Sequence, residues 1–138
     1  MKQALLPAGW VKPRGYANGV AARGTQVFIA GQIGWDESAR FTSREFGAQA
    51  VQALRNIVAV LEAAGGKPEH LVRLTWYVID KKEYLASLKE IGSAFRELIG
   101  DYDIAMSAVQ VVALVEDEAK VEIEATAVIP DDARRSDS

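Results

Sequence analysis

The chain has 138 residues, of which 49% are hydrophobic and 25% charged, a length and composition that predict one globular domain with a core of its own. The absence of cysteine excludes disulfides and thiolate chemistry, and a single histidine, His70, argues against a multi-histidine metal site or a Ser-His-Asp triad. The net charge of −3 offers no basic surface for a nucleic acid, no apolar run approaches the roughly 20 residues of a membrane span, and no secretory signal opens the chain, so we expect a cytoplasmic protein without metal or cofactor.

Two strands and a loop are predicted before the first helix. The first dozen or so residues are mixed and contain Pro7, Gly9 and Pro13, which indicates an irregular or edge segment. Residues 19–23 predict a short strand. Residues 26–33 predict a better one, because they are rich in β-formers and are bounded by glycines. Residues 34–42 are expected to form a loop.

The first helix has the clearest sequence signal. Thr42 and Glu45 have the spacing of a capping box, in which a hydroxyl and a carboxylate satisfy the first free amides of a helix. Gly65, Gly66 and Pro68 are expected to end the helix. The apolar residues between these limits recur at helical spacing: Phe46, Ala50, Ala53, Leu54, Ile57, Val58 and Leu61.

A strand and a second helix are predicted next. The strand covers residues 70–79, and Asp80 is expected to be the N-cap of a helix that ends at Gly100. The apolar stripe of this helix contains Tyr84, Leu85, Leu88, Ile91, Phe95, Leu98 and Ile99.

The C-terminal part predicts two more strands, over residues 107–115 and 121–129. The connection between them, residues 116–120, is short and mostly polar, which favours a hairpin. Residues 131–138 are expected to be a polar tail, so that the domain covers 1–138 with its core at about 15–129.

This order of elements predicts an α+β fold with two helices on one face of a mixed sheet. Val27 and Ile29 point to one face of their strand, whereas Phe28 and Ala30 point to the other. Strands that are apolar on both faces need cover on both faces, so a second subunit is expected to supply the missing cover. The alternative is a monomer with a poorly covered sheet.

Several segments together resemble the Rid family (YjgF, reactive intermediate deaminase). They are GYANGV at 15–20, FIAGQI at 28–33, ALRNI at 53–57 with LEAAGG at 61–66, and VEIEATAV at 121–128. The resemblance runs in order from about residue 15 to 129. It implies a chorismate-mutase-like fold, a homotrimer, and three small-molecule clefts between subunits. It also implies hydrolysis of enamines and imines such as 2-aminoacrylate to a keto acid and ammonia.

The sequence departs from that family at the substrate anchor. Active members carry an arginine that pairs with the substrate carboxylate, and Met106 stands in its place. A thioether offers neither charge nor a strong donor, and losing such a contact costs about 1.5–3 kcal/mol. Leu88 replaces the family asparagine, and Ala17 and Asn18 replace the usual serine and glutamine. We therefore expect 2-aminoacrylate deaminase activity to be weak or absent.

The resemblance assigns catalytic roles to Tyr16 and Glu122. Tyr16 matches the cleft tyrosine, whose hydroxyl binds ligand or delivers a proton; the alternative is a half-buried tyrosine at a strand end. Glu122 matches the glutamate that positions or activates water, and as a general base it would benefit from a raised pKa. Strand alternation places it on one face with Glu124, so two solvated carboxylates are the alternative, which we favour for Glu124.

Six further residues are candidates for ligand binding: Gly31, Met106, Ser107, Ala108, Trp35 and Arg14. Gly31 would let backbone approach a ligand, although a bulge glycine is the alternative. Trp35 is a stacking wall or a packed loop anchor, and we favour the anchor. Arg14 either replaces the missing guanidinium or is a solvated charge. His70 is expected at a surface or structural position.

Two functions remain open at this point. One is a divergent hydrolase of an imine or enamine that lacks the usual carboxylate anchor. The other is a metabolite-binding or regulatory trimer without catalysis. An RNA-cleaving activity has been attached to the family, but the acidic charge and the lack of basic and aromatic clusters do not support it here.

Overall fold

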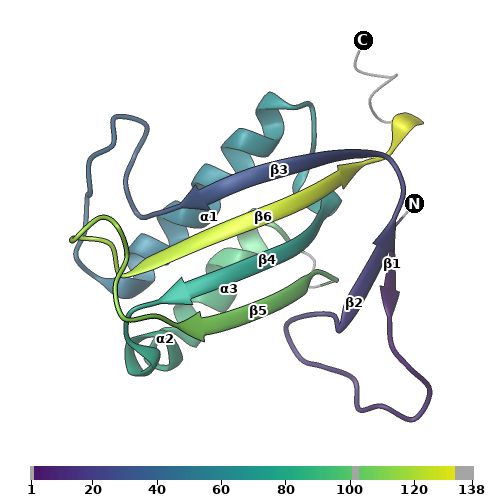
Figure 1. Ribbon diagram of the computed structural model, residues 1–138, viewed down its shortest axis with the longest axis horizontal. Helices are drawn as coiled ribbons and strands as arrows, with labels where there is room; N and C mark the ends of the chain where they lie inside the picture. The colour runs from purple at the N-terminus through teal and green to yellow at the C-terminus, as the bar shows by residue number, and fades with distance from the viewer. Residues whose placement is uncertain (1, 101–102, 133–138) are drawn as a thin grey trace.

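The computed structural model describes residues 2–100 and 103–132 and has the predicted α+β architecture (Figure 1). The end of the expected polar tail, residues 133–138, lies outside the described part. The strands are β1 (Lys2–Leu5), β2 (Gly19–Ala22), β3 (Thr25–Gln32), β4 (Leu71–Val78), β5 (Ala105–Gln110) and β6 (Val121–Ile129). The helices are α1 (Phe46–Ala63), α2 (Lys81–Ala86) and α3 (Leu88–Leu98), with a short 3-10 helix, η1 (Pro68–His70), before β4.

The strands form two sheets. β1 and β2 make a separate antiparallel hairpin, which corrects the expectation of a single sheet. The other four form a mixed sheet in the order β3-β6-β4-β5, in which β6 is antiparallel to both neighbours and β5 is parallel to β4. β3 and β5 are therefore its two edges.

The predicted hairpin between the last two strands is wrong. β6 enters the sheet between β3 and β4, and residues 111–120 cross over β4 to reach it. β5 ends at Gln110, five residues before the predicted end, and Val112 and Val115 lie almost fully exposed on the connection. Their apolar character predicted a strand, but β4 lies between β5 and β6, so the connection has to pass β4 and cannot be a tight hairpin turn.

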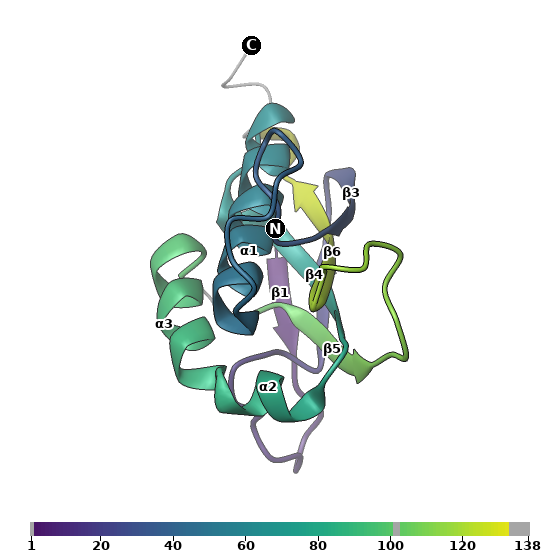
Figure 2. The ribbon, with the colours of Figure 1, turned by 90° about the vertical axis from the view of Figure 1, so that its left-hand side faces the viewer.

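The helices cover one face of the four-stranded sheet (Figure 2). Leu54 and Ile57 of α1 are fully buried, as are Ile123 and Ala127 of β6. No helix of the described residues lies on the opposite face, and Phe28 on it is 74% exposed. The prediction of helices on one face is confirmed, and an apolar residue remains on the other.

The predicted helix limits are partly right. The capping box is wrong: α1 begins at Phe46 after Glu45, which lacks a side-chain cap, and the Ser43 hydroxyl accepts a hydrogen bond from the Glu45 amide (3.0 Å) in the preceding turn. Asp80 is the N-cap of α2, as predicted, and accepts from the Lys82 amide (2.8 Å). The expected single second helix divides at Ser87, whose ψ of 4° departs from helical geometry.

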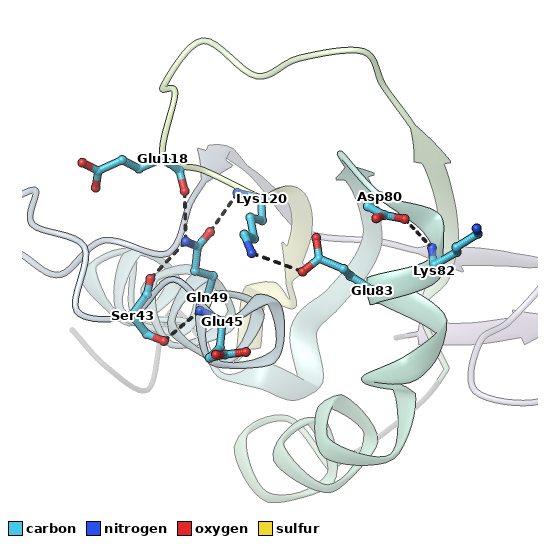
Figure 3. Close-up of polar contacts among 8 residues, drawn as sticks. All are labelled: Ser43, Glu45, Gln49, Asp80, Lys82, Glu83, Glu118 and Lys120. Carbon is cyan, nitrogen blue, oxygen red and sulfur yellow. Dashed lines mark hydrogen bonds and ion pairs between the residues drawn. The ribbon is translucent and has the colours of Figure 1, made fainter.

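A buried glutamine ties the crossover to α1 (Figure 3). The Gln49 side chain is 1% exposed, and its amide donates to the carbonyls of Ser43 (3.1 Å) and Glu118 (3.0 Å). Its carbonyl accepts from the Lys120 amide (2.8 Å). Beside it, the Lys120 ammonium pairs with Glu83 of α2 at 3.2 Å. The start of β6 is thereby fixed against two helices.

Candidate functional site

A cavity of about 610 Å³ lies at the β5 edge of the sheet, between that strand, α3 and the segment before β2. The Ala17 amide donates to the Ile104 carbonyl at 2.9 Å, and Ala17 forms a parallel bridge with Ala105. These contacts hold Tyr16 next to the start of β5. Tyr16 is 42% exposed and lines the cavity.

The walls of the cavity are mainly aromatic and aliphatic. Trp76 of β4 and Phe95 of α3 are both almost completely buried, and Tyr84 packs against Trp76 with ring centroids 6.0 Å apart. Burial raises the pKa of Tyr84, so its hydroxyl is neutral at physiological pH. Leu88 also lines the cavity and keeps this wall apolar.

Five of the sequence candidates meet at this cavity: Arg14, Tyr16, Met106, Ser107 and Ala108. Met106 is half-buried and packs against the core from the helix-covered face. The residues that sequence reasoning missed come from β4, α2 and α3: Trp76, Tyr84, Ile91, Phe95 and Arg96. Trp76 belonged to a predicted strand, and Tyr84, Ile91 and Phe95 belonged to the predicted apolar stripe of a helix. Periodicity cannot distinguish a core wall from a cavity wall.

Gly31 and Glu122 form a second group on β3 and β6. A methyl group at Gly31 would overlap the Glu122 carboxylate, so the glycine makes the room in which this carboxylate lies. Glu122 is half-buried and is paired in register with Tyr77 of β4. Beside them, the Tyr77 hydroxyl donates to Glu124 at 2.8 Å, and this hydrogen bond raises the pKa of Tyr77.

The two groups do not meet within one chain. Ile123 is fully buried on the helix-covered face, so alternation places Glu122 on the open face, whereas Met106 packs on the helix-covered side. β4 also lies between β6 and β5. One chain therefore presents Tyr16 and Met106 at one edge of the sheet, and Gly31 and Glu122 near the other.

Trp35 and His70 are not among the residues that line the cavity. The Trp35 ring packs against Phe41 at 5.8 Å, and its carbonyl accepts from Asn56 at 2.8 Å, which is the arrangement of a loop anchor. His70 is buried at the end of η1, where its Nδ1 accepts from the Lys67 amide at 3.0 Å. Burial lowers the pKa of His70 below its usual value of 6.5.

Residues 2–100 and 103–132 contain neither a metal-binding cluster nor a membrane-spanning helix. Over these residues no three His, Asp or Glu side chains gather into a set that would hold a metal ion. Within the same part of the chain no helix has the length and apolar character needed to cross a membrane.

The protein is therefore an α+β protein in which a mixed sheet has helices on one face, an open second face and a cavity at one edge. The family model described as Endoribonuclease L-PSP matches residues 11–129. The chain belongs to this family, which contains the RutC and Rid proteins.

Known members are similar along most of their length. A RutC family protein from Aquifex aeolicus is 32% identical over 93% of this chain and 99% of its own. A protein from Salmonella typhimurium named 2-iminobutanoate/2-iminopropanoate deaminase is 35% identical over 82% of this chain and 86% of its own. The solved structure of the Rid family protein YyfB from Yersinia pestis, of unknown function, has a TM-score of 0.80 at 30% identity, covering 93% of this chain and 98% of that one.

Proposed function

We propose that the protein is an imine or enamine hydrolase whose cleft forms between two copies of the chain in a homotrimer. The observation that carries this proposal is that Tyr16 and Met106 lie at one edge of the sheet, whereas Gly31 and Glu122 lie near the other edge and Glu122 is on the opposite face. A neighbouring copy whose open face lies against the β5 edge would bring the halves together. The deaminase name of the Salmonella relative supports the reaction class.

In this cleft the residues would divide the work of hydrolysis. Glu122 takes a proton from water as the oxygen attacks the C=N carbon, and the imine nitrogen gains a proton. Tyr16 donates a hydrogen bond or a proton to the substrate. The hydroxyl proton of the tetrahedral adduct then passes to its nitrogen as the C–N bond breaks, which releases ammonia and leaves a carbonyl product. Gly31 leaves the space that the Glu122 carboxylate needs.

The substrate is expected to differ from 2-aminoacrylate, because Met106 and Leu88 give an apolar wall where the family resemblance implies polar anchors. The same observation favours a second candidate function, a metabolite-binding or regulatory trimer without turnover. The two differ only in whether Glu122 performs chemistry.

The test compares Glu122→Gln with Glu124→Gln, a matched change on the same face of the same strand. An L-amino acid oxidase would supply imines with side groups from methyl to benzyl, and release of the carbonyl product would be followed. We expect Glu122→Gln to lose turnover by about 10²-fold or more while Glu124→Gln retains it. Ligand binding without turnover of any imine by the unmodified protein would overturn the enzyme and support the binding trimer.

The division of the cleft between subunits has its own test. Tyr16→Phe and Glu122→Gln chains, each inactive alone, would be unfolded and refolded together. In a random mixture of trimers, about a quarter of the clefts contain both unmodified halves, so about a quarter of the activity should return. No recovery in demonstrably mixed trimers would contradict a shared cleft.

A further inference from the structure

The β5-edge cavity has a charge that contrasts with that of the whole chain. The chain has a net charge of −3, yet Arg14 and Arg96 line the cavity and no acidic side chain is among its described lining residues. A guanidinium is weakly hydrated and offers a planar fork of donors that matches a carboxylate. The polar part of this cavity is therefore suited to an anion.

The remaining walls are suited to a large apolar group. Trp76, Ile91 and Phe95 are almost fully buried, and with Tyr84 and Met106 they surround most of the space. The volume of about 610 Å³ is in the middle of the range for small-molecule sites. A pocket for a very small ligand would not need so much apolar wall.

We propose that this cavity binds a small carboxylate with an aromatic or branched apolar group, and that Arg14 pairs with the carboxylate. Arg14 forms no hydrogen bond or ion pair with the residues that the structure describes, whereas Arg96 already interacts with another group. Arg14 is also two positions from Tyr16, so anion and reacting group would lie close together. The inference rests on the proposed function for the place of the ligand and goes further by naming its class.

In this arrangement Met106 contributes to specificity. Its thioether adds apolar surface to the cavity wall. An arginine at position 106 would instead fill part of the cavity and would bind the carboxylate next to β5. The anion is then held from the side of the loop before β2, and the apolar group extends toward α3.

The test uses three matched probes that cannot be hydrolysed as imines. They are 3-phenylpropionate, its neutral amide 3-phenylpropanamide, and propionate, which lacks the ring. Calorimetry would measure affinity, and Trp76 in the wall provides a fluorescence signal. We expect 3-phenylpropionate to bind about tenfold or more tightly than either of the other probes, because only it makes both the charge-assisted and the apolar contacts.

Two arginine variants assign the anchor. Arg14→Gln should remove the preference for acid over amide and leave amide affinity unchanged, which also shows that the apolar wall is intact. Arg55→Gln, at an exposed position of α1 outside the cavity, should behave like the unmodified protein. If Arg14→Gln still binds the acid more tightly than the amide, Arg14 is not the partner of the carboxylate. If propionate and 3-phenylpropionate bind with equal affinity, the cavity does not select a ligand with a large apolar group.

These outcomes are separate from those of the proposed function. Probe binding does not require Glu122 to act, so the ligand class stands or falls without turnover. Conversely, loss of imine turnover in Glu122→Gln supports the hydrolase even where 3-phenylpropionate fails to bind.

Discussion

Gly31 and Glu122 show how one missing side chain positions another. The carboxylate of Glu122 lies in the space that a methyl group on residue 31 would occupy. The backbone of Gly31 does not have a positive φ, so the glycine is needed for close approach and not for its conformational freedom. The lack of a side chain at Gly31, near the end of β3, therefore determines where the carboxylate of the proposed general base can lie.

We predict that Gly31→Ala lowers imine turnover strongly with little effect on stability. The end of a flexible side chain can move away from the new methyl group, but the carboxylate then leaves its working position. Thermal unfolding should stay near that of the unmodified protein, while turnover falls by about 10²-fold. Gly19→Ala is the control, because its methyl group would meet only Leu5 at an ordinary 3.4 Å. Full turnover in Gly31→Ala would show that Glu122 does not depend on this space.

At the scale of elements, the connection from β5 to β6 depends on one amide side chain. Residues 111–120 contain no strand or helix, and Gln49 makes two hydrogen bonds to their last part and one to Ser43. This places Val121 in register with Val78, from which the rest of β6 follows. Gln49 thus connects helix α1 to the register of the strand that carries Glu122.

We predict that Gln49→Met lowers the free energy of unfolding by about 1–3 kcal/mol. Methionine has a similar shape, but it leaves the Lys120 amide and the two carbonyls without their partner. Chemical denaturation would measure the change. Gln52→Met on the same helix is the control, because it removes a single i,i+4 hydrogen bond to Asn56 and should cost about 0.5 kcal/mol or less. Equal losses in the two variants would contradict a special role for Gln49.

At the scale of the whole molecule, the described helices cover only one side of the four-stranded sheet. Phe28 is 74% exposed on the open face, and Val109 at the β5 edge is 45% exposed. Burying a phenylalanine side chain contributes about 1.5–3 kcal/mol, and a homotrimer would gain this at each copy. A homotrimer would both cover the open face and bring together the two halves of the proposed cleft.

We predict that Phe28→Glu converts the trimer to a monomer. A carboxylate on the open face would have to be buried without a partner in the assembled state. Light scattering after size exclusion should show the mass of three chains for the unmodified protein and one for the variant. Val60→Glu, on the exposed surface of α1, should leave the mass unchanged. A monomeric unmodified protein at micromolar concentration would contradict the assembly itself.

Local signals were enough to predict most elements. Asp80 caps α2 with its own side chain, and Gly65 ends α1 with a φ of +81°, so both limits depend on chemistry within a few residues. The strand over residues 71–78 likewise follows from a run of β-forming residues. The break at Ser87 and the early end of β5 depend on packing between elements, which periodicity does not contain.

The candidate site, like the fold, was predictable in part from local sequence and in part was decided by tertiary structure. The sequence by itself determined the fold class and the family resemblance, and it proposed Tyr16, Glu122 and Met106 as candidate site residues. Only the tertiary structure decided that Tyr16 and Met106 share a cavity with Arg14, and that Glu122 lies on the opposite face beside Gly31. The reason is physical: residue preferences act along a few positions of the chain, whereas strand order and face place residues that are about 90 positions apart side by side.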